Sequence, residues 1–179
     1  MAPAMSRIRV LYDEAAIAAR VEKIAGDIAA RQLDNLLVIS VLRGSFIFAA
    51  DLLRAMHRKG LAPQVEFMQL SSYREGTVSS GQVTITKDIE GDVRGRDVLI
   101  IDDILESGRT LAFAKDLLMA RGAKSVCIAV MVEKPGHRAV NLDADFVGFV
   151  SPDLFLVGYG MDVAHSWRQL PYIGVVEVD

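Results

Sequence analysis

Two adjacent carboxylates stand at the end of an apolar run in the segment VLIIDDILESGRTL, residues 98–111. Asp102 and Asp103 directly follow the run VLII, which has the branched composition of a buried strand. Neighbouring side chains on a strand point to opposite faces, but the backbone at a strand end can turn both toward one ligand. Paired carboxylates in such a place can accept hydrogen bonds from a sugar diol or bind magnesium.

A turn rich in hydrogen-bond donors begins three residues after the acid pair. Residues 106–110 supply backbone N–H groups, the hydroxyls of Ser107 and Thr110, and the permissive Gly108. The turn leads into a predicted helix, and the N-terminus of a helix attracts phosphate. Together the two features suit a ligand that carries a hydroxylated ribose and a terminal phosphate. The alternative is a solvated strand end followed by an ordinary helix cap.

The elements that would position these residues alternate between apolar runs and helical periodicity. Predicted strands lie at residues 36–42, 65–70, 98–101 and 126–132, and predicted helices at about 13–32, 46–56 and 110–121. Strands that are apolar on both faces and alternate with helices indicate an α/β fold with a mostly parallel central sheet flanked by helices. Ligands bind such sheets at the carboxyl ends of the strands. We expect the chain to open with the first helix and residues 102–108 to form a loop.

Two segments depart from this alternation. Residues 71–92 are polar and contain the alternating sequence VTIT, which predicts a loop that runs into a hairpin arm and serves as a flexible lid. Near the end of the chain, predicted short strands at residues 146–150, 155–157 and 172–178 are separated by glycine and proline. We expect these strands to form a small cap, or hood, over the sheet edge.

The composition limits the classes of protein that fit. The chain has 179 residues, of which 51% are hydrophobic, so it predicts one domain over residues 1–179 and excludes intrinsic disorder. Its net charge of −3 argues against a nucleic-acid binder. The single cysteine and the absence of a signal peptide or a long uncharged apolar segment predict a cytoplasmic protein without membrane contact. His57, His137 and His165 show no spacing typical of a catalytic triad or a zinc site.

The acid pair and the turn resemble the phosphoribosyl pyrophosphate motif of type I phosphoribosyltransferases. Further blocks are similar, in the family's order, to hypoxanthine (hypoxanthine-guanine) phosphoribosyltransferases, and together they cover about residues 11–178. These blocks are Leu42-Arg43-Gly44-Ser45, Ser72-Tyr73, Glu133-Lys134-Pro135, the segment PDLFLVGY at residues 152–159, and Asp162 with Arg168. Agreement among the blocks is much more specific than any one of them.

The resemblance implies a purine salvage enzyme with the type I phosphoribosyltransferase fold. Such an enzyme transfers ribose 5-phosphate from phosphoribosyl pyrophosphate to nitrogen 9 of hypoxanthine or guanine, needs magnesium, releases pyrophosphate, and usually forms homodimers or homotetramers. By similarity, Asp102 and Asp103 bind the ribose hydroxyls directly or through magnesium. The residues expected around the 5′-phosphate are Glu106, Ser107, Gly108, Arg109 and Thr110. Glu106 stands where the family usually has an aspartate that exchanges a proton with nitrogen 7 of the purine.

The resemblance also assigns residues to the pyrophosphate. Arg43 and Gly44 belong to a loop in which the family has a cis peptide bond that turns backbone N–H groups toward the leaving group. Arg43 replaces the usual lysine of this loop. Arg168 is expected to neutralise charge on the pyrophosphate, and the Ser72-Tyr73 pair belongs to the lid that closes over the reacting centre.

A third group of residues is implied to bind the purine. Lys134 is expected to donate a hydrogen bond to the 6-oxo group, which selects hypoxanthine and guanine over adenine. Phe155 would stack on the base, and the backbone around Leu156 would read the base edge. Asp162 lies in the same region and is expected to approach a second magnesium ion. The sequence leaves open the preference among hypoxanthine, guanine and xanthine.

Two other functions remain open, and a third is excluded. One is a regulatory RNA-binding protein with the same fold, which would need a basic surface. The other is a catalytically impaired ligand sensor, suggested by the substitutions at Arg43 and Glu106. A nucleotide hydrolase of the Walker type would also place acidic residues after a strand, but the sequence contains no G-x-x-x-x-G-K-[ST] motif.

Overall fold

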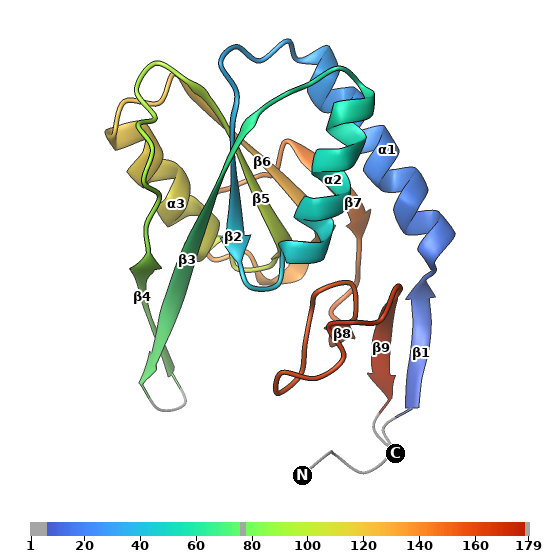
Figure 1. The fold of residues 1–179 in the computed structure, drawn as a ribbon. Coiled ribbons are helices and arrows are strands. Elements are labelled where there is room, and N and C mark those ends of the chain that lie inside the picture. The colour runs from blue at the N-terminus through green and yellow to red at the C-terminus, as the bar shows by residue number, and fades with distance from the viewer. Residues whose placement is uncertain (1–6, 76–77, 178–179) are drawn as a thin grey trace.

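The computed structural model describes residues 7–75 and 78–177, and the side chains within these ranges except those of residues 73–81. Its main layer is a six-stranded sheet in the order β4-β3-β2-β5-β6-β7 (Figure 1). All neighbouring strands run parallel except β4, which is antiparallel to β3. The strands are β2 (Leu37–Leu42), β3 (Gln64–Glu75), β4 (Val78–Lys87), β5 (Asp97–Leu105), β6 (Ser125–Glu133) and β7 (Phe146–Val150).

Helices cover both faces of this sheet. Helices α1 (Glu14–Ala30) and α2 (Phe46–Arg58) lie on one face, and α3 (Arg109–Ala120) lies on the other (Figure 1). The Asp13 side chain caps α1 by accepting a hydrogen bond from Ala16 N at 2.8 Å. None of the described helices is long and apolar enough to cross a membrane. The predicted α/β fold with a mostly parallel, helix-flanked sheet is confirmed.

Each face of the sheet has its own apolar core. The core under α1 and α2 contains Phe48, Leu52 and Leu99, all fully buried, and continues into the C-terminal segment. The core under α3 contains Ile100 and Leu118 from opposite sides of the interface. Adjacent residues Leu99 and Ile100 therefore serve different cores, as expected for a strand that is buried on both faces.

A second, three-stranded antiparallel sheet has the order β1-β9-β8 and consists of β1 (Arg7–Tyr12), β8 (Leu156–Val157) and β9 (Ile173–Glu177). This sheet and the turns of residues 158–172 form the hood. The strand at residues 146–150, which was also predicted to belong to the hood, instead pairs with β6 as the edge strand β7 of the main sheet. The expectation that the chain opens with a helix is wrong, because β1 precedes α1. Arg7 pairs with Glu177 across this sheet. Such distant pairing leaves no local signal in a six-residue segment with no buried residue.

Two loop predictions are also wrong. The acid pair lies inside β5 rather than in a loop, because β6 continues to pair with β5 as far as Leu105 and Glu133. Residues 71–75 belong to β3, which pairs with β4, and the hydroxyl oxygens of Ser71 and Thr84 lie 2.8 Å apart. The two strands form the predicted hairpin arm, whose tip at residues 76–77 is outside the described residues. A lid function for this arm stays a prediction.

Asp97 fastens the start of β5 and gives a prediction about stability. Its buried carboxylate accepts hydrogen bonds from Asp34 N and Ser125 Oγ, both at 2.6 Å, and lies 3.5 Å from Lys124 Nζ. The Ser125 hydrogen bond, followed by those of Asp34 and Lys124, lowers the pKa of Asp97 despite burial. The carboxylate form is therefore the one that stabilises the fold.

We expect Asp97→Asn to lower the free energy of unfolding by about 1–3 kcal/mol at neutral pH, since a buried donor loses a charged acceptor. The folded-state pKa is below the unfolded value of about 3.9, so the stabilisation is complete above that value and is lost as the pH falls through the folded pKa. The difference between the two proteins should shrink in acid. Urea unfolding at neutral and acidic pH measures it, and a constant difference would contradict this account.

Candidate active site

The candidate site lies where the order of the parallel strands reverses, between β2 and β5. Chain order runs from β2 outward to β3 on one side, and from β5 outward to β6 and β7 on the other. Loops leave such a point in opposite directions and open a crevice at the carboxyl ends of the strands. The loop of residues 42–45 follows β2 here, and the acid pair lies near the end of β5. The sheet order thus brings together two motifs about 60 residues apart in the sequence.

Gly44 contacts the acid pair so closely that no side chain fits between them. A Cβ atom added to Gly44 would lie 1.9 Å from Asp103 Oδ2. The Leu42–Arg43 peptide bond in the same loop is cis, as the resemblance implied. Ser45 anchors the loop to β2, because its buried hydroxyl donates to Val41 O at 2.5 Å and lies 2.7 Å from Ser40 Oγ.

The hood closes on the same loop. Gly160 has a φ of +99°, and a Cβ atom added there would lie 2.3 Å from Gly44 O. Arg168 holds this turn, since its NH1 donates to Gly160 O at 2.6 Å and its NH2 lies 2.9 Å from Asp162 Oδ1. His165 N also donates to the Asp162 carboxylate, at 2.7 Å. Arg168 and Asp162 are therefore next to the loop, although the Asp162 carboxylate is engaged within the hood.

The acid pair spans the space between the loop and the phosphate-binding turn predicted at residues 106–110. Asp103 faces Gly44, whereas Asp102 lines a hollow of about 190 Å³ together with residues 104–108, 110 and 111. Burial raises the pKa of both carboxyl groups, and for Asp102 the like charge of Asp103 raises it further. Positive charge at this position therefore stabilises the pair, and Arg168 supplies part of it by lowering the pKa of Asp103.

The turn itself has the geometry of an anion site. Gly108 has a φ of +80°, and its backbone precedes the first residue of α3, Arg109. Arg109 N donates to Ser107 Oγ at 3.3 Å, and Thr110 lines the hollow. The backbone N–H groups at the start of α3, together with the helix dipole, suit a phosphate group.

Lys134 and Glu106 meet at the ends of β6 and β5. Lys134 is 7% exposed, and its Nζ lies 3.9 Å from Glu106 Oε1. Its backbone N–H donates to Leu105 O at 2.9 Å, which fixes the residue against the end of β5. A buried ammonium group at this edge is a strong hydrogen-bond donor for a ligand.

The remaining predicted residues are spread around the crevice. Phe155 is 61% exposed, while the next residue, Leu156, is buried in β8. Arg43 and Ser72 are exposed, and the side chain of Tyr73 is outside the described residues. The structure thus places Asp102, Asp103 and residues 106–110 in one continuous group with Gly44, but it leaves the contribution of Ser72 and Tyr73 a prediction.

Sequence reasoning missed the residues that join the loop after β6 to the phosphate turn. Arg138 NH1 donates to Glu106 O at 2.7 Å, and its NH2 pairs with Glu133. Glu106, His137 and Asp153 form the one group of three metal-capable side chains found within residues 7–75 and 78–177. These residues follow three different strands, so no spacing in the sequence could have revealed their proximity.

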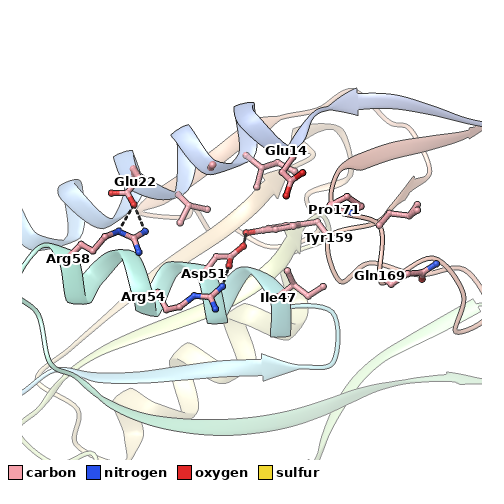
Figure 2. Close-up of a pocket in the computed structure, with 13 residues that line it drawn as sticks. Glu14, Glu22, Ile47, Asp51, Arg54, Arg58, Tyr159, Gln169 and Pro171 are labelled. Carbon is pink, nitrogen blue, oxygen red and sulfur yellow. Dashed lines mark hydrogen bonds and ion pairs between the residues drawn. The ribbon is translucent and has the colours of Figure 1, made fainter.

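A separate cavity of about 460 Å³ lies between α1, α2 and the hood (Figure 2). Tyr159 OH donates to Asp51 Oδ2 at 2.6 Å, and burial raises the Tyr159 pKa far above its usual value. Arg58 in its wall pairs with Glu22, as Figure 2 shows. The cavity contains none of the predicted site residues, and four of its charged side chains form two pairs, Arg58 with Glu22 and Arg54 with Asp51.

Comparison with known proteins shows the family of the chain. Residues 9–164 match the model of the phosphoribosyl transferase domain. The chain is 42% identical over 172 residues to hypoxanthine phosphoribosyltransferase of Escherichia coli strain K12, covering 94% of this chain and 95% of that protein. The chain belongs to the hypoxanthine phosphoribosyltransferase family.

Two further relatives are a longer, bifunctional protein and a protein with a solved structure. The chain is 45% identical over 170 residues to the bifunctional protein TilS/HprT of Listeria innocua, covering 94% of this chain but only 26% of that protein. It thus spans about a quarter of the bifunctional relative. A solved hypoxanthine phosphoribosyltransferase from Trypanosoma cruzi, a lysine-to-arginine mutant in a ternary substrates complex, has a TM-score of 0.89 and 35% identity, with 96% of each chain covered.

The contact between Gly44 and Asp103 gives a prediction about the candidate site. We expect Gly44→Ala to turn the Asp103 carboxylate away, because the new methyl group would overlap Oδ2. Affinity for phosphoribosyl pyrophosphate with magnesium, measured by calorimetry, should fall about tenfold or more.

Gly26→Ala on α1 is the matched control, since an added Cβ there meets nothing within 4 Å. It should leave affinity unchanged and leave the fold as stable or more stable. Equal affinity of the Gly44→Ala variant and the wild type would show that Asp103 does not depend on the glycine.

Proposed function

We propose that this chain transfers ribose 5-phosphate from phosphoribosyl pyrophosphate to nitrogen 9 of hypoxanthine, and of guanine. The contact of Gly44 with Asp103 carries the proposal, because it joins the candidate pyrophosphate loop to the candidate ribose site. The turn at residues 106–110 adjoins Asp102 on the other side. A sugar with its hydroxyls on the acid pair can reach the turn with its 5′-phosphate and the loop with its pyrophosphate.

Magnesium fits the carboxylates of this site. Asp102 and Asp103 are hard oxygen donors whose burial is costly without a nearby cation, and magnesium in proteins is commonly held by one or two carboxylates plus substrate phosphates. When bound there, magnesium would bind the neutral ribose hydroxyls as a Lewis acid and offset the negative charge on the pyrophosphate. Asp162 is the proposed residue near a second ion, although it is engaged with Arg168 in the hood.

The protein's part in the reaction is alignment and stabilisation of charge. As the bond from the ribosyl carbon to the pyrophosphate oxygen breaks, the sugar gains oxocarbenium character, and the bond to nitrogen 9 forms. Backbone N–H groups of the loop at Arg43 and Gly44, together with Arg168, bind the departing pyrophosphate. The 5′-phosphate stays on the turn formed by Ser107, Gly108, Arg109 and Thr110 while the sugar carbon moves.

The purine is bound at the ends of β6 and β8. Lys134 donates to the 6-oxo group, Phe155 stacks on the ring, and the backbone at Leu156 reads the opposite edge. Glu106 accepts the proton that nitrogen 7 gives up as nitrogen 9 attacks. Glu106 lies beside Lys134, and the 6-oxo group and nitrogen 7 lie on the same edge of a purine. This placement supports the assignment of the 6-oxo group to Lys134 and of nitrogen 7 to Glu106. The enzyme is expected to act as a homodimer or homotetramer.

Steady-state release of pyrophosphate tests the function. We expect turnover with hypoxanthine and guanine and little turnover with adenine. The rate with xanthine then shows whether the enzyme also accepts this third 6-oxopurine. Binding of phosphoribosyl pyrophosphate without turnover of any purine would indicate the ligand sensor instead. The absence of such binding by folded protein would overturn the whole proposal.

Glu106→Gln tests the proton acceptor. The amide keeps the size of the side chain but cannot accept a proton at neutral pH, so kcat should fall at least about a hundredfold. Affinity for phosphoribosyl pyrophosphate should stay within about twofold, because the turn binds through its backbone. Glu90→Gln, at an exposed position, is the control. Unchanged turnover of Glu106→Gln would remove Glu106 from proton transfer.

Lys134→Met tests selection of the base. Methionine replaces the buried ammonium group without leaving a large cavity, so kcat/KM for hypoxanthine should fall by about 10- to 100-fold. The kcat/KM for adenine should change little, so the ratio of kcat/KM for hypoxanthine to that for adenine should fall. Lys23→Met, on the exposed face of α1, is the control. An equal loss for both bases would show that Lys134 does not read the 6-position.

A further inference from the structure

His137 lies beside Glu106 at the mouth of the site. A nitrogen of His137, a carboxylate oxygen of Glu106 and a carboxylate oxygen of Asp153 lie within 4.8 Å of one another. His137 Nε2 is 2.7 Å from Asp153 Oδ2, a hydrogen-bonding distance. Glu106 follows β5, His137 belongs to the 3-10 turn Pro135–His137 after β6, and Asp153 follows β7. The loops of three adjacent strands therefore converge on one carboxylate.

Backbone contacts hold His137 in this place. Lys134 N donates to Leu105 O on one side of the 3-10 turn, and Ala139 N donates to Ser107 O on the other, both at 2.9 Å. Arg138, the next residue, donates to Glu106 O at 2.7 Å. The backbone of His137 is thus held by bonds to the same turn that carries Glu106, so the fold keeps the backbones of these two residues close together.

Glu106 needs such a neighbour more than an aspartate would. Its side chain is 46% exposed, and a glutamate has one more rotatable bond than an aspartate. Packing therefore does not fix the carboxylate, and a displacement of about 1 Å is enough to impair proton transfer. Within the described residues, the side chains that face it are Lys134, whose Nζ is 3.9 Å away, and the pair of His137 with Asp153.

We propose that His137, oriented by Asp153, is a positioning residue that holds the Glu106 carboxylate opposite Lys134 for proton transfer from the purine. The inference rests on the proposed function and adds a residue to it. The Asp153 carboxylate lies 2.7 Å from His137 Nε2 and so orients the ring. The ring then limits the rotation of Glu106 on the side away from Lys134.

The test compares His137→Ala in two backgrounds, the wild type and Glu106→Asp. In the wild type we expect kcat with hypoxanthine to fall about tenfold, while KM for phosphoribosyl pyrophosphate changes by less than about twofold. In the Glu106→Asp background the same substitution should cost less than about twofold, because the shorter carboxylate does not need the histidine. A merely structural role of His137 would not depend on the length of residue 106.

Two more variants sharpen the result. His137→Gln keeps an N–H near the position of Nε2 and should recover most of the turnover lost in His137→Ala, whereas Asp153→Asn should lower kcat in the same direction as His137→Ala. His57→Ala, at an exposed position on α2, is the matched control and should match the wild type. Thermal unfolding of every variant checks that the fold is kept.

The outcomes separate this inference from the proposed function. Wild-type turnover of hypoxanthine together with an unaffected His137→Ala variant would overturn the inference alone. An equal loss in both backgrounds would also overturn it, since the effect would not pass through Glu106. Absence of wild-type turnover, or full turnover by Glu106→Gln, would instead remove the proton-transfer step on which the inference rests.

Discussion

The close approach of the loop after β2 to the acid pair of β5 is the constraint on which the site depends. Neither Gly44 nor Gly160 has room for a Cβ atom, because one would overlap the Asp103 carboxylate and the other the Gly44 carbonyl oxygen. Three distant segments thus meet through backbone and one carboxylate. The reversal of strand order between β2 and β5 makes this meeting possible, since it sends the two loops apart and leaves a crevice between them.

Electrostatics follow from the same packing. Asp102 and Asp103 are adjacent and partly buried; burial raises the pKa of both carboxyl groups, and the like charge of Asp103 raises the pKa of Asp102 further. The fold offsets only part of this cost: Asp103 N donates to Asp102 Oδ1 at 2.9 Å, and Arg168 lies near Asp103. A site with uncompensated negative charge beside a helix N-terminus suits a ligand that brings both a cation and a phosphate.

The central layer of the fold was predictable because its signals are local. The apolar runs that become β2, β5 and β6 and the periodicity of α1 each depend on neighbouring residues. The N-terminal strand was not predictable, because Arg7 to Tyr12 are extended only through pairing with β9. The motif at residues 102–110 predicts the phosphate side of the candidate site, but the prediction of a loop at residues 102–105 was wrong, since the partner Glu133 that extends β5 lies on another strand. The proximity of His137 to Asp153 carried no signal, because it exists only in three dimensions.

The hydrogen bonds between the loop after β6 and the phosphate turn explain how the chain can carry Glu106 where the family usually has an aspartate. Lys134 N, Arg138 NH1 and Ala139 N bond to the backbone oxygens of Leu105, Glu106 and Ser107, respectively. None of these bonds uses the side chain of residue 106, so its length can change without moving the turn or the phosphate it is proposed to bind. A longer side chain changes only where the carboxylate lies. The loop after β6, which these bonds hold in place, carries the residue that contacts the carboxylate in its new position. The effect of one added methylene at residue 106 therefore depends on which residue stands at position 137.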